Sequence, residues 1–266
     1  MKNKNILLVG CGKMGFALLG GLVKAGVKAS NIAVVEPSPA GELVASGARV
    51  LADASDVGDK FDFCILAIKP QNFDDAVRPY NFLGNGKCVF VSIAAGKTIS
   101  KMEALLGNET PVARAMPNLP AMVGAGVTAV VFNSKIDLEA KVGVTELLGS
   151  VGEVVELYDE KQIDAVTAVS GSGPAYIFHL IECLQNAGEK LGLEKSVALQ
   201  LAKSTVYGAG KLSVESDRSP EQLRIDVTSK GGTTEAALNV LMSDKKLENL
   251  MLDAIKAAEK RSKELQ

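Results

Sequence analysis

A glycine-rich turn near the start of the chain constrains the fold more than any other feature. It reads Gly10-Cys11-Gly12-Lys13-Met14-Gly15 and lies between an apolar run, 5–9, and a helix-length stretch, 13–25. In a G-x-G-x-x-G turn, the first glycine allows a tight bend, the second lets backbone approach a pyrophosphate, and the third lets helix pack on strand. The helix N-terminus offers N–H groups to phosphates. We therefore predict a dinucleotide site; a purely structural turn is the alternative.

The chain divides into two halves with different patterns. Short β-rich runs alternate with helix-length stretches before residue 158, which predicts an α/β domain, 1–159, with a doubly wound parallel sheet covered on both faces. The expected strands are 5–9, 32–36, 63–68, 88–92, 112–115, 127–132 and 153–157. The second half, 160–266, reads as helices only. Helix start and stop residues predict a helix over 160–169, a second between Pro174 and Gly192, and a third that begins at the capping box of Ser219. An amphipathic pattern predicts the last helix.

Composition excludes several classes of function. Lys and Arg count 29 and Asp and Glu 31, so the net charge of −2 gives no electrostatic footprint for nucleic acid. The 47% hydrophobic content indicates a globular protein, and the excess of apolar residues indicates a subunit interface. The N-terminal apolar run is too short for a signal peptide, which predicts a cytoplasmic protein. Residues 115–134 carry no charge, but prolines and glycines break any helix there, so we expect buried loop and strand and no membrane span.

The cysteines and the single histidine carry no clear chemistry. Cys11, Cys64, Cys88 and Cys183 lie far apart, so neither a disulfide framework nor a metal site is expected, and we interpret the thiols as buried and reduced. His179 lies on an apolar helix with no acid beside it in sequence to orient it. We interpret His179 as a core or surface residue without a catalytic role rather than as a general base.

Glu36 closes the second predicted strand. An acid at this position accepts hydrogen bonds from a ribose 2′-hydroxyl and repels a 2′-phosphate, which favours NADH over NADPH. The alternative is a solvated acid at a strand end next to Pro37.

Four further segments are candidates for ligand contacts. Three follow predicted strands, at the edge where ligands of open α/β sheets bind, although each is equally consistent with an ordinary βα connection. The fourth, 227–235, precedes a helix and exposes backbone N–H groups suited to a small carboxylate, although an interhelical turn capped by Thr233 is the simpler interpretation. The first three segments are Ala67-Ile68-Lys69-Pro70, Ser92-Ile93-Ala94-Ala95-Gly96 and Arg114-Ala115-Met116-Pro117-Asn118-Leu119-Pro120.

Taken together, these segments resemble the pyrroline-5-carboxylate reductases, the family that catalyses the last step of proline biosynthesis. SGSGPAY followed by a Gly-Gly-Thr-Thr loop is far more specific than the dinucleotide fingerprint. The matches are GCGKMG (10–15), AIKP (67–70), SIAAG (92–96), RAMPNLP (114–120), SGSGPAY (170–176) and SKGGTT (229–234), in order along nearly the whole chain.

The resemblance implies an N-terminal Rossmann domain and a C-terminal all-α dimerisation domain that intertwines with a partner, often as a ring of dimers. The implied reaction is hydride transfer from NAD(P)H to the cyclic imine 1-pyrroline-5-carboxylate. The implied cofactor contacts are Val9, Gly10, Cys11, Gly12, Lys13, Met14, Glu36, Ala67, Ile68, Lys69, Pro70, Ile93, Ala94 and Ala95. The implied substrate contacts are Ser229, Gly231, Gly232, Thr233 and Thr234, with the catalytic hydroxyl of Thr234 near the imine nitrogen.

Two departures from the family pattern and two alternative functions stay open. Lys230 stands where the family commonly has proline, and Glu36 replaces the small hydroxylated residue often found in NADPH-dependent members. A β-hydroxyacid dehydrogenase would need a lysine in the first long helix after the sheet, but residues 162–189 contain neither lysine nor arginine. An NADH-sensing regulator would need a basic DNA-reading helix. The sequence leaves the oligomer size and the identity of the cyclic imine open.

Overall fold

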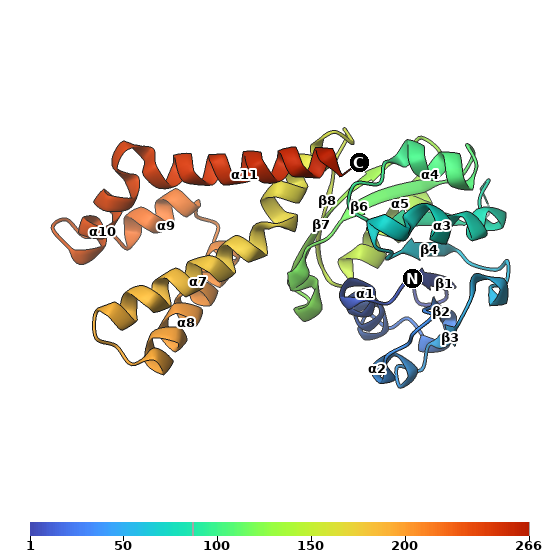
Figure 1. The fold of residues 1–266 in the computed structure, drawn as a ribbon, viewed down its shortest axis with the longest axis horizontal. Helices are drawn as coiled ribbons and strands as arrows, with labels where there is room; N and C mark the ends of the chain where they lie inside the picture. The colour runs from blue at the N-terminus through green and yellow to red at the C-terminus, as the bar shows by residue number, and fades with distance from the viewer. Residues whose placement is uncertain (87, 266) are drawn as a thin grey trace. The chain divides into compact units, whose positions relative to one another are not determined.

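The computed structural model describes residues 1–86 and 88–265. These residues form two compact units, one comprising Met1–Gly171 with Ala258–Gln266 and the other comprising Ser172–Ala257. The first unit contains the sheet, and the second is helical (Figure 1).

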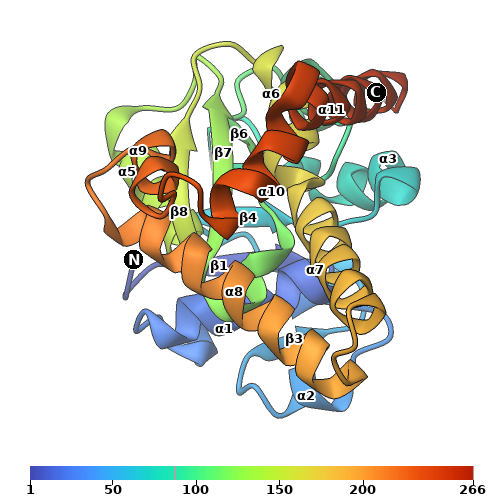
Figure 2. The same ribbon diagram turned by 90° about the vertical axis from the view of Figure 1, so that its left-hand side faces the viewer.

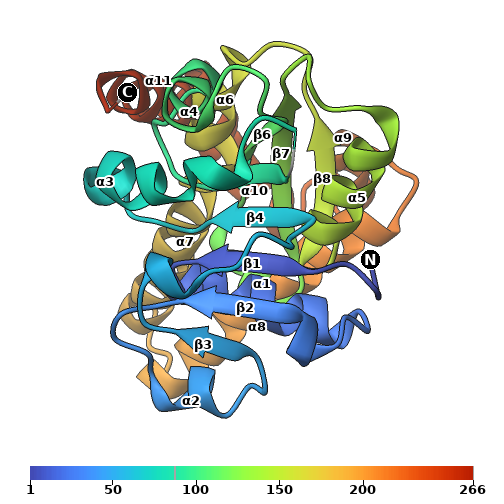
Figure 3. The same ribbon diagram turned by 90° about the vertical axis from the view of Figure 1, so that its right-hand side faces the viewer.

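The sheet of the first unit has the described strand order β3-β2-β1-β4-β5-β6-β7-β8 (Figure 3). Neighbouring strands pair in parallel except β6 and β7, which are antiparallel. This confirms the predicted α/β class with its mostly parallel sheet. The strands are β1 (Ile6–Val9), β2 (Ile32–Val35), β3 (Arg49–Leu51), β4 (Phe63–Leu66), β5 (Val89–Ser92), β6 (Val112–Met116), β7 (Gly126–Phe132) and β8 (Gly152–Glu156).

Among the described strands, the one departure from the predicted parallel pairing is that β7 runs antiparallel to β6. A parallel pair needs a crossover of about a dozen residues or more, usually with a helix. The connection from β6 to β7 is shorter and holds only the 3₁₀ helix η5 (Leu119–Val123), so the chain turns back. The sequence pattern also fails to predict β3, because this edge strand has only three residues and none of them is buried.

Helices cover both faces of the sheet. They are α1 (Lys13–Lys24), α2 (Gly41–Val44), α3 (Phe73–Val77), α4 (Ile99–Leu106), α5 (Leu138–Gly149) and α6 (Gln162–Val166). Successive β1 residues alternate between two separate cores: Ile6 and Leu8 contribute to one, and Leu7 and Val9 to the other. Burial on both faces explains why β1, β2 and β4 are continuous apolar runs.

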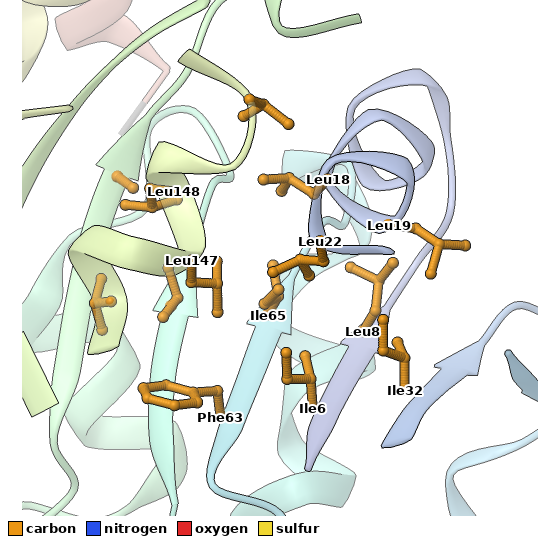
Figure 4. Packing of buried hydrophobic residues seen from close by; sticks show 14 of the residues in the cluster. Ile6, Leu8, Leu18, Leu19, Leu22, Ile32, Phe63, Ile65, Leu147 and Leu148 are labelled. Atoms are coloured by element: carbon orange, nitrogen blue, oxygen red, sulfur yellow. The ribbon is translucent and has the colours of Figure 1, made fainter. Parts of the chain in front are cut away.

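The first core packs α1 and α5 against one face of the sheet (Figure 4). Leu18 and Leu22 of α1 and Leu147 of α5 are almost completely buried, and they belong to the same cluster as Ile6 and Ile65. Fully burying one such leucine is worth about 2 kcal/mol. This packing fixes α1 against the end of β1 and so holds the glycine-rich turn between them.

Two expectations about burial are wrong. The uncharged stretch 115–134 is not buried throughout, because Val123 in η5 is 80% exposed and Met122 is more than half exposed. Cys64 and Cys88 are buried as expected, but Cys11 is only half-buried and Cys183 is exposed. Cys183 lies on α7 (Gly173–Lys190), a helix in which no residue is buried in the single chain. Within the described ranges, no helix is long and apolar enough to cross a membrane.

The second unit consists mainly of helices, of which α7 and α8 pack side by side (Figure 2). Its helices are α7, α8 (Lys195–Glu215), α9 (Pro220–Asp226), α10 (Thr233–Met242) and most of α11 (Lys246–Glu264). Two predicted ends are confirmed: Gly192 follows α7 with φ +95°, and Ser219 Oγ accepts the Gln222 N–H at 3.2 Å before α9. The predicted helix 160–169 is instead α6 followed by a π-helix, Thr167–Gly171.

Candidate active site

A cleft of about 720 Å³ lies where β1, β2 and β4 end. Eight of the predicted cofactor residues line it: Val9, Gly10, Cys11, Gly12, Glu36, Ala67, Ile68 and Lys69. Lys13 and Met14 form the start of α1, and Pro70 begins the 3₁₀ helix that follows. Ile93 joins the same sheet edge, because its N–H donates to Leu66 O at 3.1 Å, and Ala94 and Ala95 follow it.

The three glycines of the turn have different surroundings. Gly10 has φ +85°, and a Cβ on it would lie 2.6 Å from Ala67 O. A Cβ on Gly15 would lie 2.6 Å from Gly10 O. Gly12 has φ −68°, which any residue adopts, and a Cβ there would meet nothing within 4 Å. The fold itself therefore requires Gly10 and Gly15, whereas the space at Gly12 is left for a ligand.

Glu36 ties the end of β2 to the glycine-rich turn. Its Oε2 accepts the Cys11 N–H at 2.9 Å, and its Oε1 accepts the Ser38 N–H at 3.3 Å. Burial of the thiol and, to a smaller extent, the nearby negative charge of Glu36 raise the pKa of Cys11 to about 11. The thiol is therefore protonated at neutral pH, and Cys11 serves the turn through its backbone rather than as a nucleophile.

The cleft has an acidic lining. Asp53 and Asp75 line it with Glu36, and among the described residues that line it Lys69 is the one cation. The pKa of Asp53 is lowered mainly by a hydrogen bond from the Ser55 backbone N–H and further by one from the Ser55 side chain. This carboxylate is therefore ionised at neutral pH. Sequence reasoning missed Asp53 because it follows β3, the strand that the pattern does not predict. Asp75 lies within α3 and carries no sequence signal.

In the second unit, Ser229 and the two glycines form a compact turn at the start of α10. The Gly232 N–H donates to Ser229 O at 3.0 Å, and a Cβ on Gly232 would lie 2.5 Å from Ser229 Oγ. Gly232 is the N-cap of α10, without a side-chain cap, so the segment is an interhelical turn, but the expected cap by Thr233 is wrong. Thr234 is the second residue of the helix and is half-buried.

Glu235 is a member of this turn whose role sequence reasoning missed. Its Oε2 accepts the Gly231 N–H at 2.7 Å, where Gly231 has φ +72°. Glu235 is the third residue of α10, the position from which a carboxylate commonly reaches back to the backbone at a helix start, although the N-cap here is Gly232 and not Ser or Thr. The turn therefore binds one carboxylate of its own, while the remaining first-turn N–H groups of α10 have no partner within the helix.

His179 is exposed, with its side chain 75% accessible. Glu182, one helical turn away, lies 3.0 Å from its Nδ1, and Cys183 Sγ lies 3.7 Å from its Nε2. The expectation that no acid orients this ring is therefore wrong, because residues three apart in sequence are neighbours on a helix.

The residues of the cleft fit a dinucleotide cofactor. The N–H groups at the start of α1 provide donors for phosphates, Gly12 leaves space beside them, and Glu36 lies at the end of β2. Among the residues that the structure describes, no group of three His, Cys, Asp or Glu side chains is placed to hold a metal ion.

Comparison with known proteins assigns both parts of the chain. A family model described as pyrroline-5-carboxylate reductase dimerisation matches residues 160–265. A second, described as NADP oxidoreductase, coenzyme F420-dependent, matches residues 5–96.

Curated relatives and solved structures match over nearly the whole chain. The pyrroline-5-carboxylate reductase of Pseudomonas aeruginosa is 38% identical over 100% of this chain and 98% of its own length. The structure of a pyrroline-5-carboxylate reductase from Coxiella burnetii matches with a TM-score of 0.93 and 36% identity, over 99% of this chain and 98% of that one. The Plasmodium falciparum pyrroline carboxylate reductase with NADP bound has a TM-score of 0.87 and 28% identity, covering 100% and 99%. The chain belongs to the pyrroline-5-carboxylate reductase family.

Proposed function

We propose that this chain reduces the cyclic imine 1-pyrroline-5-carboxylate to L-proline with NADH as the preferred cofactor. The observation that carries the reaction is the Ser229-Gly231-Gly232 turn at the start of α10, next to Thr234, in a chain whose first unit has a dinucleotide cleft. Family membership argues against a β-hydroxyacid dehydrogenase and against a non-catalytic regulator.

The chemistry makes modest demands on the side chains. NADH, when bound, supplies the hydride. The first-turn N–H groups of α10 and the positive end of the helix hold the substrate carboxylate. The Thr234 hydroxyl donates a hydrogen bond to the ring nitrogen, where electron density increases during reduction. Because a protonated imine is already an electrophile, positioning contributes most of the catalysis and no strong acid is needed. Neither Cys11 nor His179 takes part.

A steady-state assay with pyrroline-5-carboxylate, run with NADH and NADPH in parallel, tests this function. We expect oxidation of the reduced cofactor to be matched by the formation of proline, measured by chromatography. Absence of proline with both cofactors, from a folded protein, would show that the substrate is a different cyclic imine or that the assignment is wrong.

The acidic lining of the cleft supports the cofactor preference. Glu36, Asp53 and Asp75 place negative charge in the cleft, and Glu36 stands where an acid accepts hydrogen bonds from a ribose hydroxyl. A 2′-phosphate would be repelled there. The NADP bound to the Plasmodium falciparum relative makes a parallel measurement of both cofactors necessary.

Replacing Glu36 by Ser should move the ratio of kcat/KM values towards NADPH. We expect a shift of about one to three kcal/mol, comparable to one charged hydrogen bond, because repulsion of the 2′-phosphate is removed. The measurement is kcat/KM for both cofactors. Glu42→Ser is the matched control, since Glu42 is exposed on α2 and does not line the cleft. A wild-type protein that already prefers NADPH tenfold would contradict the assignment of Glu36.

We also propose that the protein is a dimer, with a ring of dimers and a cytoplasmic location as the family resemblance implies. Ile177, Leu184, Leu201 and Leu212 on α7 and α8 are all more than two-fifths exposed in the single chain. These helices belong to the region that matches the dimerisation model. Light scattering at assay concentration should therefore give at least twice the mass of the chain. An active monomer would contradict this prediction.

A further inference from the structure

We propose that Arg114 and Glu160 are positioning residues for hydride transfer. Together they fix the backbone of residues 93–99, the segment that follows β5 and contains Ile93–Ala95. The proposal rests on the proposed function, because the family resemblance is what assigns cofactor contacts to Ile93–Ala95.

One carboxylate oxygen joins three elements of the first unit. Arg114 lies in β6, and its Nη1 donates to Glu160 Oε1 at 2.7 Å. The same oxygen accepts the backbone N–H of Ile99, the first residue of α4, at 2.8 Å. Glu160 itself lies just before α6, and its carbonyl accepts the Ile163 N–H at 3.0 Å. Arg114 is nearly inaccessible, with only 3% of its side chain exposed.

The other end of the segment is fixed by the sheet. Ser92, the last residue of β5, is paired in register with Arg114 of β6. The Ile93 N–H donates to Leu66 O at 3.1 Å, and the Ala94 N–H donates to Ser92 Oγ at 3.3 Å. The start of the segment is therefore held by β4 and β5. Its end, at Ile99, is held by Glu160.

Two features indicate that this pair does more than stabilise the fold. Arg114 is buried and the Glu160 side chain is 30% exposed. Such a largely buried ion pair is weak evidence for stability, because removing charge from water offsets much of the attraction. The Ile99 N–H is one of the first-turn groups of α4 that lack a partner within the helix. Thr98 Oγ accepts the Lys101 N–H at 3.2 Å, so the side chain of the N-cap is already engaged and Glu160 supplies the acceptor for Ile99. Arg114 orients that acceptor.

Small displacements matter in this reaction because its catalysis depends mainly on positioning. A misplacement of about 1 Å caused by a change far from the chemistry can lower a rate by about a hundredfold. If the end of the segment shifts when Ile99 loses its acceptor, we expect slower hydride transfer without loss of the fold.

Two matched double variants separate the acceptor from the charges. Both Arg114→Met/Glu160→Gln and Arg114→Met/Glu160→Met remove the two charges of the pair, so neither leaves a charge unpaired. Gln keeps an oxygen for the Ile99 N–H, whereas Met, of similar length, does not. The surface pair Lys141–Glu156, which joins α5 and β8 at 2.7 Å, provides the control variant Lys141→Met/Glu156→Met.

The readouts are kcat, the isotope effect on kcat with NADH deuterated at the transferred position, and thermal unfolding. For the Glu160→Met double variant we expect kcat to fall on the order of tenfold, part of the loss that a misplacement of about 1 Å causes, with a larger isotope effect. The Glu160→Gln double variant keeps the acceptor but loses the Arg114 side chain that orients it, so its kcat should lie between that of the wild type and that of the Glu160→Met double variant. A fall in kcat that only follows the folded fraction, with the wild-type isotope effect, would overturn the proposal, as would equal kcat values in the two double variants.

Hydrogen exchange gives a second readout that needs no turnover. Without substrate, amide exchange over residues 93–99 should be fastest in the Glu160→Met double variant and intermediate in the Glu160→Gln double variant, which keeps the acceptor but not the Arg114 that orients it. Equal exchange in the two variants would overturn the proposal. If the wild type fails to reduce pyrroline-5-carboxylate but the exchange difference is found, the proposed function fails while the role of the pair in fixing this segment stands.

Discussion

Replacing Gly12 by Ala should weaken NADH binding by about a hundredfold, or about 2.7 kcal/mol, and leave the free energy of unfolding nearly unchanged. The backbone at Gly12 has a conformation open to alanine, and the added methyl group meets no atom of the protein within 4 Å. It does occupy the space through which a pyrophosphate approaches the backbone. Fluorescence titration with NADH and chemical denaturation measure the two quantities.

The neighbouring glycines provide controls for this result. Gly20 lies on the exposed face of α1 with nothing within 4 Å, so Gly20→Ala should stabilise the helix by about 0.5–1 kcal/mol and leave NADH binding unchanged. Gly15→Ala forces a contact with Gly10 O and should lower stability as well as binding. Gly12→Ala protein that binds NADH like the wild type would show that the cofactor does not approach this turn.

Replacing Thr234 by Ala should lower kcat by roughly ten to a hundredfold, the low end of general-acid effects, with NADH affinity nearly unchanged. The hydroxyl lies in the first turn of α10, beside the proposed carboxylate site. The loss is modest because a protonated imine reacts without an obligatory acid. Steady-state kinetics and NADH titration measure the two effects.

Thr234→Ser is the matched variant because it keeps the hydroxyl, and it should recover most of the lost kcat. Two results would contradict the role of Thr234. One is wild-type kcat in a folded Thr234→Ala dimer. The other is a loss confined to the dissociation constant for NADH.

The parts of the fold that could be predicted from sequence are those specified by local patterns. β1, β2 and β4 are buried on both faces, so each is a continuous apolar run, and the glycine-rich turn has its own spacing. The direction of β7 and the existence of β3 depend on pairing with distant residues. The proximity of Glu182 to His179 could also be predicted from the sequence, because residues three apart on a helix are neighbours.

Long-range contacts of the site carry no local signal. Arg114 and Glu160 lie 46 positions apart, and only the folded sheet brings the middle of β6 close to the residues that precede α6. The Cys11–Glu36 hydrogen bond is similar, because the sequence placed both residues at the cofactor site but not in contact with each other. Residue identity predicted eight of the positions that line the cleft, whereas the hydrogen bonds among those positions required the structure.

The sparse burial within the helical unit has a thermodynamic consequence. Of residues 172–257, only Ala198 and Ala202 are buried in the single chain, so this unit has almost no core of its own. When the core is completed by a partner chain, folding becomes a bimolecular equilibrium, and stability gains a mass-action term that rises with protein concentration. Dilution then acts on this protein as a denaturant does, and the abundance of the chain in a cell helps to determine how much of it is folded.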